Sequence, residues 1–311
     1  MISNQIDTND AGMRLDRYVK KLLPNAKPSL LYKSIRKKNI TVNGKKAKEE
    51  DVLALGDTVE IYFSDETLAK FSKTPKSVKG KFPAIVFESE DFIIMDKPVG
   101  VLSHGTGNAY ERNMVDDMLA YLIHTKSYNP RAEKTFVPSI CNRLDRNTSG
   151  LILGAKTAAG LRAANGWIRN REVEKYYMTI VEGELKDVRK VENRLTKDGE
   201  KNRVVEGEDG KDAVGIYRPL KTTGDYTLVE AELITGRTHQ IRQQLASIGH
   251  PVLGDRKYGR ASRRFGELHH QLLHAYKLVF PETEDFPEVS GKVFISEPKG
   301  KFQRIRESLH V

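Results

Sequence analysis

Two kinds of apolar spacing follow each other near the start of the chain. Between Leu15 and Leu23 apolar residues recur at i, i+3, i+4, i+7 and i+8, which is typical of one face of a helix, and Pro24 ends the pattern. A second helix is expected from Ser29, a residue type favoured at the N-cap. After Ile40 the period shortens to two, and Asn43-Gly44 is typical of a tight turn between strands. The sequence therefore predicts two helices followed by a small sheet.

From residue 82 onward the chain is richer in β-strand patterns. Two apolar runs, 85–87 and 92–95, are separated by four polar residues and predict a hairpin. Further strands are predicted at 151–156, 173–182, 226–234 and 276–280, and helices at 113–124, 158–170 and 238–248. Strands and helices intermix without regular βαβ spacing, which favours a mixed α+β sheet over a doubly wound one.

Residues 64–81 separate these two parts of the chain. They contain five lysines and two acidic residues with little apolar periodicity, which is typical of a flexible linker. At 311 residues the chain also exceeds the usual size of one domain, roughly 100 to 200 residues. The sequence thus predicts a small domain at 14–63, a basic linker at 64–81 and a larger domain at 82–305.

The charge of the chain is unevenly distributed. Fifty-two Lys and Arg against forty-two Asp and Glu leave a net charge of +10. Between Arg14 and Phe63 twelve basic residues face six acidic ones, so this short segment carries +6 of the total. Such an excess favours a polyanionic partner, either a nucleic acid or an anionic membrane.

Cysteine content and hydropathy indicate the compartment. Cys141 is the single cysteine, which excludes an internal disulfide framework and argues against a zinc ribbon. Residues 1–12 lack the basic start and apolar run of a secretory signal, and no segment approaches the ~18 unbroken apolar residues that a membrane span requires. We therefore expect a cytoplasmic protein that does not enter a membrane.

The segment from Asn142 to Gly150 contains the strongest candidate for chemistry. Asp145 lies between Arg143 and Arg146, whose charges would favour an ionised carboxylate, and a Thr-Ser-Gly sequence after it can supply hydrogen-bond donors. An ionised aspartate in a pocket can act as a nucleophile or as a general base. The alternative is that Asp145 caps a turn or forms a surface ion pair, and local sequence alone favours that alternative.

The N-terminal pattern resembles the S4 RNA-binding domain. The residues that carry the resemblance are Arg14-Leu15-Asp16, Ile40-Thr41-Val42-Asn43-Gly44 and Leu55-Gly56-Asp57. The resemblance implies RNA binding, with phosphate contacts expected from the basic residues of the second helix and the turn: Lys33, Arg36, Lys37, Lys38, Lys45 and Lys46. The alternative is a small domain whose lysines only keep it soluble.

Five motifs occur in an order that resembles the RluA-type pseudouridine synthase family. They are Lys97–His104, Asn142–Gly150, Glu174–Gly183, Thr235–Arg242 and Gly254–Gly259. The Lys-Pro-Ser-Leu-Leu-Tyr sequence at 27–32 makes the RluC-like branch, which acts on large-subunit ribosomal RNA, the most similar. The resemblance implies an isomerase that converts uridines of RNA, expected to be of the 23S type, to pseudouridine. A tRNA substrate and a non-catalytic, RNA-binding assembly factor remain alternatives.

Roles for individual residues follow from the same resemblance. Asp145 is then the essential aspartate, Tyr177 the tyrosine that stacks on the uracil, and Arg242 the charge partner of Asp145, for which Arg237 is the competing candidate. The remaining predicted substrate contacts are Arg143, Lys97, Arg237 and His239. The reaction implied needs no metal, nucleotide or redox cofactor, and the sequence has no phosphate-binding loop or paired-cysteine ligand set. We expect a monomer.

Three positions depart from the family pattern. Asn142 stands where the family usually has His, and Gln243-Gln244 where it usually has Val-His. An asparagine side chain donates and accepts hydrogen bonds but does not titrate near neutral pH. The departure puts in doubt any proton-handling role of position 142, while the chemistry expected of Asp145 is unaffected.

Overall fold

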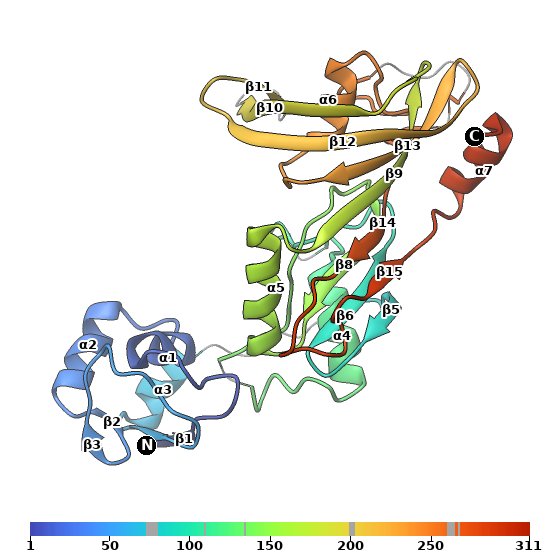
Figure 1. Cartoon of the computed structure of the whole chain (residues 1–311). Helices are drawn as coiled ribbons and strands as arrows, with labels where there is room; N and C mark the ends of the chain where they lie inside the picture. The colour runs from blue at the N-terminus through green and yellow to red at the C-terminus, as the bar shows by residue number, and fades with distance from the viewer. Residues whose placement is uncertain (73–79, 109, 134, 199–202, 260–264, 267) are drawn as a thin grey trace.

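The N-terminal part of the chain forms a unit with its own sheet and core. The computed structural model describes the whole chain except residues 73–79, 109, 134, 199–202, 260–264 and 267. The elements of this unit are β1 (Ile2–Gln5), α1 (Leu15–Leu22), α2 (Pro28–Arg36), β2 (Ile40–Val42), β3 (Lys45–Lys46), β4 (Thr58–Ile61) and α3 (Asp65–Phe71). The sheet order is β1-β4-β2-β3 (Figure 1). The two helices and the small sheet predicted from the apolar spacing are present.

The boundaries of this unit differ from the predicted 14–63. β1 pairs antiparallel with β4, so the unit begins before residue 14. Residues 65–71, placed in the predicted linker, form α3, whose N-terminus is capped by the Ser64 side chain. Leu68 of α3 is buried in the core of the unit, and Phe71 packs against that core. Two apolar contacts in seven residues are too few to stand out as a helical pattern, and residues 73–79 of the predicted linker lie outside the described residues.

The larger part of the chain is built around an 11-stranded sheet. Its strands are β5 (Ala84–Glu88), β6 (Phe92–Lys97), β7 (Ser139–Ile140), β8 (Ser149–Ala155), β9 (Glu174–Glu182), β10 (Arg189–Asp198), β11 (Arg203–Glu206), β12 (Lys211–Thr222), β13 (Tyr226–Leu233), β14 (Leu273–Val279) and β15 (Val293–Ile295). The order is β11-β10-β12-β13-β9-β14-β8-β6-β5, with β15 paired to β14 and β7 to β8. Among the described strands only β14 and β8 run parallel to each other. The predicted α+β fold with a mixed, mainly antiparallel sheet is confirmed.

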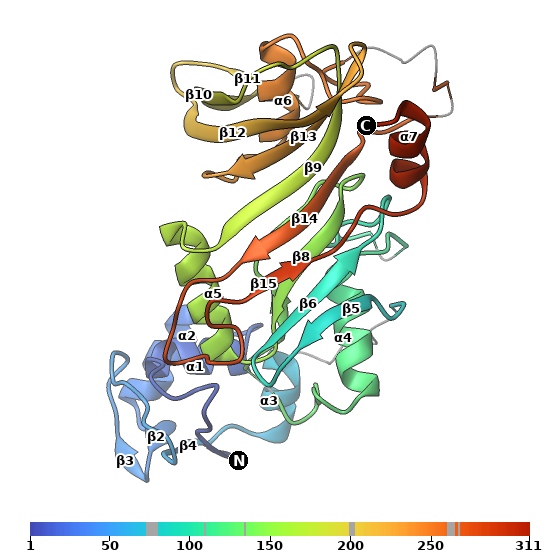
Figure 2. The ribbon, with the colours of Figure 1, turned by 45° about the vertical axis from the view of Figure 1, so that its right-hand side comes forward.

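Helices cover both faces of the lower half of this sheet (Figure 2). These are α4 (Met114–His124) and α5 (Ala158–Asn170); two others, α6 (Gln240–Ser247) and α7 (Lys301–Leu309), lie by the upper half. Ile93 and Met95 of β6 pack in the cluster that contains Met118 of α4, whereas Ile94 packs with Trp167 of α5. Alternate residues of one strand thus bury their side chains on opposite faces. None of the helices in the described residues is long and apolar enough to cross a membrane.

Strands β10 to β12 form a wing that the apolar pattern did not predict. In β10 only Leu195 is buried, and charged side chains occupy most other positions. The face of β10 that carries Val191, Asn193 and Leu195 buries only Leu195 fully, so the apolar alternation is too weak for hydropathy to reveal the strand. β15 and α7, which follow the last predicted strand, were also missed.

The two parts of the chain meet at the N-terminal end of α5, as both ribbon views show (Figures 1 and 2). The Asn9 Oδ1 atom accepts a hydrogen bond from the N–H of Ala158 over 2.9 Å, and the Asn9 amide donates to Glu133 over 3.3 Å. The hydroxyl of Thr135 also donates to the carboxylate of Asp10. The N-terminal unit is therefore fixed by direct hydrogen bonds to the larger domain.

Candidate active site

The candidate site lies where the loop between β7 and β8 meets α6. Asp145 belongs to this loop, and Arg242 Nη1 donates to Asp145 Oδ2 over 2.9 Å. The Arg242 side chain is only 8% exposed and that of Asp145 is 25% exposed, so the carboxylate reaches solvent while a fixed charge holds it. The competing candidate, Arg237, instead donates its Nε atom to the carbonyl of Asp212 over 2.9 Å.

A second carboxylate fixes the orientation of Arg242. Asp255 is fully buried and accepts two hydrogen bonds from Arg242, over 2.6 Å from Nε and 2.9 Å from Nη2. Burial opposes ionisation of Asp255, but its hydrogen bonds and the charge of Arg242 outweigh burial and hold its pKa below the usual value. The forked guanidinium is thus clamped on one edge and presents Nη1 to Asp145. The motif containing Asp255 was recognised in the sequence, but no role was assigned to this residue.

The loop that carries Asp145 is fixed on both sides of the aspartate. Before it, the Ser103 hydroxyl accepts from the N–H of Leu144 over 2.9 Å and donates to the carbonyl of Leu144 over 2.7 Å. After it, Lys97 Nζ donates to the carbonyl of Arg146 over 2.9 Å. These bonds hold the backbone around Asp145 without using its carboxylate.

Lys97 does not reach the surface where RNA would lie. Its side chain is fully buried, and Nζ also donates to the carbonyls of Pro98 and Val101 over 3.1 and 2.7 Å. Burial lowers the pKa of Lys97 to about 7, against the charge of Asp145, which raises it. The predicted RNA contact is therefore corrected: Lys97 braces two loops from inside.

Of the two arginines that flank Asp145 in sequence, only Arg143 lines the pocket that contains it. Arg143 is exposed and lines the pocket in front of Asp145. Arg146 turns away, and its Nε donates to the carbonyl of Gly100 over 3.2 Å while Nη1 lies 3.5 Å from Glu111. The charge in contact with Asp145 thus comes from α6 rather than from its neighbour in sequence.

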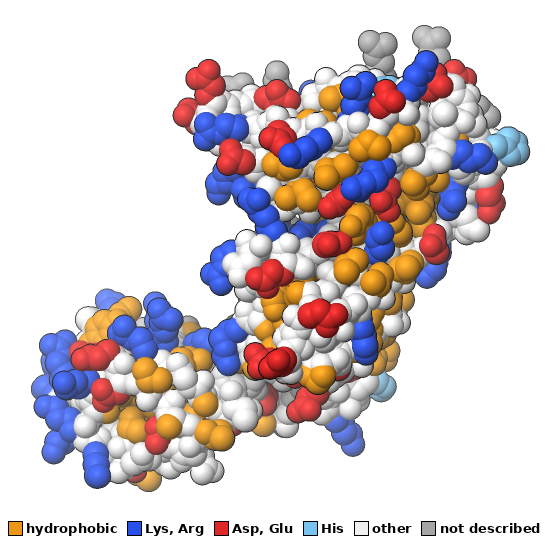
Figure 3. All heavy atoms as spheres, in the orientation of Figure 1, with side chains coloured by type: hydrophobic (Ala, Val, Ile, Leu, Met, Phe, Trp, Pro, Cys, Tyr) orange, Lys and Arg blue, Asp and Glu red, His pale blue; other side chains and the backbone are white. Residues whose placement is uncertain are grey.

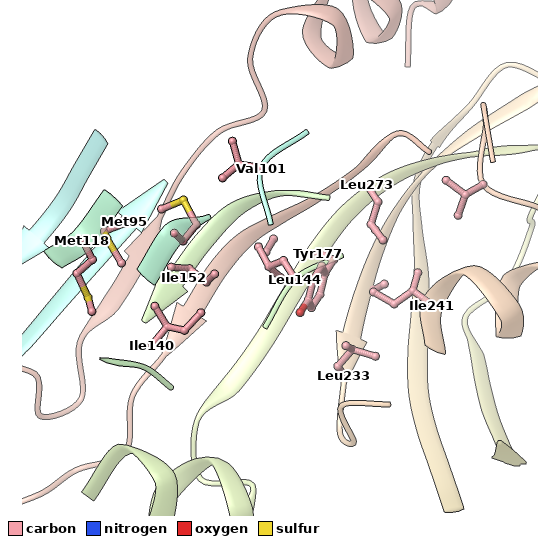
Figure 4. Close-up of a cluster of buried hydrophobic side chains, with 14 of the residues drawn as sticks. Met95, Val101, Met118, Ile140, Leu144, Ile152, Tyr177, Leu233, Ile241 and Leu273 are labelled. Atoms are coloured by element: carbon pink, nitrogen blue, oxygen red, sulfur yellow. The ribbon is translucent and has the colours of Figure 1, made fainter. Parts of the chain in front are cut away.

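The pocket in front of Asp145 has a polar side and an apolar side. Its volume is about 60 Å³. The lining residues are Arg143, Leu144, Asp145, Thr148, Tyr177, Leu233, Arg237, His239, Gln240, Ile241, Arg242 and Leu273. Figure 4 shows Leu144, Tyr177, Leu233, Ile241 and Leu273 gathered from separate segments, with the Tyr177 ring among aliphatic side chains. A flat ring, apolar walls and one carboxylate suit a small planar group that reacts next to an ionised acid.

Tyr177 and its neighbour Tyr176 point to different environments. The Tyr176 hydroxyl donates to Glu174 over 2.7 Å, and its ring lies 3.8 Å from Lys277 Nζ, outside the pocket. The Tyr177 ring lines the pocket and is 8% exposed. Burial, and the charge of Asp145, raise the pKa of Tyr177, so its hydroxyl stays protonated. The structure brings together Asp145, Arg242 and the tyrosine that motif spacing selected.

Residues 91–247 match the family described as RNA pseudouridylate synthase. The chain belongs to this family. It is 33% identical over 301 residues to ribosomal large subunit pseudouridine synthase C of Vibrio vulnificus, covering 92% of this chain and 91% of that protein. It is 32% identical over 250 residues to ribosomal large subunit pseudouridine synthase D of Borreliella burgdorferi, covering 78% and 74%. The RluA-type family and the RluC-like branch predicted from the motifs are confirmed, and the chain is an RNA pseudouridine synthase.

A solved structure supports the fold of this synthase. Human RNA pseudouridylate synthase domain containing 4 aligns with a TM-score of 0.59 at 20% identity, covering 73% of this chain and 93% of that one.

Within the described residues, no group of three or more His, Cys, Asp or Glu is placed to hold a metal ion.

The residues that depart from the family pattern serve packing in this synthase. Asn142 Oδ1 accepts a hydrogen bond from the N–H of Leu153 over 2.8 Å, so this side chain braces β8 and does not line the pocket. The Gln243 amide donates to Glu206 of β11 over 3.3 Å, and Gln244 is fully buried against β10 and β12. The two glutamines thus join α6, which carries Arg242, to the wing.

The basic residues of the N-terminal unit lie apart from the pocket. Figure 3 shows Lys and Arg side chains over the outer side of this unit. All six residues predicted to contact phosphate are exposed: Lys33, Arg36, Lys37, Lys38, Lys45 and Lys46. Among them Arg36 forms an ion pair with Glu49 over 3.4 Å. The structure places them on one unit and Asp145 on the other.

His239 and Tyr258 form a pair at the rim of the pocket. His239 Nε2 lies 3.8 Å from Asp145 Oδ2, and Nδ1 lies 2.9 Å from the Tyr258 hydroxyl. The Arg242 guanidinium lies 5.3 Å from the centre of the Tyr258 ring. His239 was predicted as a substrate contact; Tyr258 was given no role, although it follows Asp255 in a recognised motif.

Proposed function

We propose that this synthase converts specific uridines of large-subunit ribosomal RNA to pseudouridine, with Asp145 as the nucleophile. The observation that carries the proposal is the arrangement of Asp145, Arg242 and Asp255, in which a solvent-reaching carboxylate is held by a clamped arginine. The ribosomal substrate is supported by the names of the relatives, which are large subunit synthases C and D. We further propose that the enzyme acts in the cytoplasm, as a monomer and without a cofactor.

One carboxylate oxygen of Asp145 is available for the reaction. Arg242 occupies Oδ2, and no hydrogen bond to Oδ1 comes from the described side chains or backbone. In one route Oδ1 attacks the ribose C1′; the C1′–N1 bond breaks, and its electron pair leaves with the uracil. The uracil turns, C5 attacks C1′ to displace the carboxylate, the C5 proton is lost, and N1, which left with the electron pair, takes up a proton. In the other route Asp145 attacks C6 of the base first. A carboxylate facing a developing positive sugar suits glycosidic bond cleavage, as in glycosidases.

Tyr177 supplies a stacking surface for the uracil in this proposal. Its hydroxyl is kept protonated by burial and by the charge of Asp145, which makes it a poor base at neutral pH. The aromatic face can stack on an unstacked base. Tyr177 therefore positions the ring while Asp145 does the chemistry.

The target uridine must leave the RNA stack to reach the pocket. Arg143, exposed at the rim, fills the vacated space or holds the phosphate of the flipped nucleotide. The S4-like N-terminal unit binds the surrounding RNA through its exposed basic residues, with salt-sensitive contacts of low sequence selectivity.

The test is to incubate the protein with ribosomal RNA transcripts and to map pseudouridine. We expect Asp145→Asn to abolish modification, because the amide is no longer a nucleophile, while Asp187→Asn, an exposed carboxylate between β9 and β10, leaves it unchanged. Unchanged modification by Asp145→Asn would overturn the assignment of the nucleophile. Transfer RNA in the same assay distinguishes the alternative substrate, and RNA binding without turnover by the wild type would favour the assembly factor.

A further inference from the structure

The His239 ring, at the N-terminus of α6, is held in one orientation by its backbone and by Tyr258. The backbone of His239 has φ +53° and ψ +18°, a left-handed conformation that is uncommon outside glycine. Its side chain is only 13% exposed and is fixed at Nδ1 by the Tyr258 hydroxyl. Such a backbone persists only where its surroundings determine it, and such positions concentrate at functional sites.

The direction of the hydrogen bonds around Tyr258 can be assigned. The backbone N–H of Val204 in β11 donates to the Tyr258 hydroxyl over 2.7 Å. Because a backbone N–H can only donate, the hydroxyl accepts there, and its own proton is available to His239 Nδ1. A neutral imidazole whose Nδ1 accepts carries its proton on Nε2. The arrangement of Val204 and Tyr258 therefore favours the Nε2–H tautomer of His239.

The Nε2–H group of this tautomer faces the reacting carboxylate. Nε2 lies 3.8 Å from Asp145 Oδ2, which is too long for a strong hydrogen bond, and Oδ2 already accepts from Arg242 over 2.9 Å. His239 also lines the pocket, as Asp145 does. This donor is thus directed into the space that the substrate occupies and is free to bind an acceptor there.

Burial favours the neutral form of the ring. Burial lowers the pKa of His239, and Arg242 and Lys257 lower it further, while the charges of Asp145 and Asp255 oppose them. Tyr258, the remaining titratable group in contact, is a protonated phenol whose pKa is raised mainly by burial. A neutral N–H donor suits a carbonyl oxygen, whereas a phosphate would favour a cation.

We propose that Tyr258 fixes His239 as an Nε2–H donor to a carbonyl oxygen of the flipped uracil. The inference rests on the proposed function, because it concerns the same pocket. When the C1′–N1 bond breaks, the electron pair left on uracil spreads onto its carbonyl oxygens, so a fixed donor there stabilises the transition state more than the bound substrate. In this assignment His239 touches the substrate without exchanging its proton, and Tyr258 is a positioning residue.

The tautomer can be measured without RNA. In protein labelled with ¹⁵N-histidine, long-range ¹H–¹⁵N spectra at pH 7 should show His239 with its proton on Nε2, the signal being assigned by its loss in His239→Gln. Tyr258→Phe should give a mixture of tautomers, because Nδ1 loses its donor. A cationic ring or an Nδ1–H tautomer in the wild type would overturn the proposal, whatever the enzyme acts on.

The role in turnover is tested with variants that keep or remove the donor. His239→Leu should lower kcat by about 100-fold, the usual effect of losing one oxyanion donor. In His239→Gln the amide N–H still donates, so this variant should recover most of that kcat. Tyr258→Phe should lower kcat by about tenfold, with little change in KM. The matched control is Tyr176→Phe, whose hydroxyl bonds Glu174 outside the pocket.

Two kinetic results would contradict the proposal. Equal losses in His239→Gln and His239→Leu would indicate proton transfer rather than donation, and a Tyr258→Phe effect confined to KM would remove the role in the transition state. A wild-type enzyme without turnover would refute the proposed function instead, and the spectra above would still decide the tautomer.

Discussion

The amide oxygen of Gln244 accepts a buried hydrogen bond of 2.6 Å from the hydroxyl of Tyr217. The Gln244 nitrogen reaches the carbonyls of Val191 and Ala213 over 3.2 and 3.1 Å. A Cβ atom at residue 215 would lie 2.8 Å from the Tyr217 hydroxyl oxygen and 2.9 Å from Gln244 Oε1, so any larger residue there would displace this hydrogen-bonded pair. The side chain two residues after Arg242 thus joins α6 to β10 and β12 in the interior.

Replacing Gln244 with Leu should therefore destabilise the fold. Each buried partner left unpaired costs about 1 to 3 kcal/mol, and we expect a total loss of about 2 to 4 kcal/mol after relaxation. The measurement is urea denaturation of the wild type and the variant. Because the wing and Arg242 share this anchor, the folded variant should also have a lower kcat.

The matched control is Gln303→Leu on α7. Its amide donates to Glu307 at an exposed position, so we expect a change below about 0.5 kcal/mol. If Gln244→Leu were as stable as this control, the buried hydrogen bonds would contribute nothing to the free energy of unfolding.

Asp255→Asn should show what the clamp on Arg242 contributes. Removing one member of a buried ion pair leaves an uncompensated charge and costs about 3 to 5 kcal/mol. We expect that loss at pH 7 in denaturant unfolding, together with a reduced kcat, since Nη1 of Arg242 is no longer aimed at Asp145. Asp212→Asn, which alters an exposed pair with Arg194 over 3.5 Å, should cost less than about 1 kcal/mol.

The pH dependence of this loss has a defined sign. Hydrogen bonds and the charge of Arg242 outweigh burial and hold the pKa of Asp255 below its usual value in the folded state. Its contribution is therefore fully present above its unfolded pKa, about 3.9, and is lost as the pH falls through the lower folded value. The difference in unfolding free energy between wild type and Asp255→Asn should stay constant from pH 7 to about pH 5 and shrink below about pH 4. A difference that grew on acidification would mean that another group titrates.

Elements with a buried apolar face were predictable, and elements without one were not. Helix α5 was predicted at 158–170 and is found there, because its apolar spacing is regular and Thr157 is a good N-cap. Strand β10 buries only Leu195 and was missed. α3 was assigned to a linker because only Leu68 and Phe71 contact the core. The local sequence shows a regular apolar pattern only where an element buries one face. Strand β10 and helix α3 lack that pattern, because they are held by contacts with distant segments.

The site divides in the same way. Asp145, Tyr177 and Arg242 were identified from motifs in the chain, and the structure brings them to one pocket. The clamp by Asp255 could not be read from the sequence, because the partner of a buried carboxylate is set by tertiary contact. Lys97 was misassigned since lysine is usually exposed, and only the fold shows its ammonium among carbonyl groups.

Lys97→Met should lower the free energy of unfolding and leave RNA affinity unchanged. The substitution keeps an apolar stem but leaves the carbonyls of Pro98, Val101 and Arg146 without their donor. We expect a loss of about 2 to 4 kcal/mol in urea unfolding. RNA affinity, measured under conditions where the variant is folded, should equal that of the wild type. A weaker affinity would mean that Lys97 contacts RNA directly, as the sequence predicted.

Neutralising the basic face of the N-terminal unit should weaken RNA binding in a salt-dependent manner. Lys37 and Lys45 are exposed, and each phosphate contact releases bound counterions, so the slope of log K against log salt should fall by about 0.7 to 0.9 for each residue replaced by Gln. The measurement is a fluorescence titration of ribosomal RNA fragments at several salt concentrations. The matched control replaces Lys301 and Arg304 on α7, at the opposite end of the molecule (Figure 1), and alters net charge by the same amount. Equal slopes for the two double variants would mean that binding responds to total charge alone and that the N-terminal unit is not the RNA-binding surface.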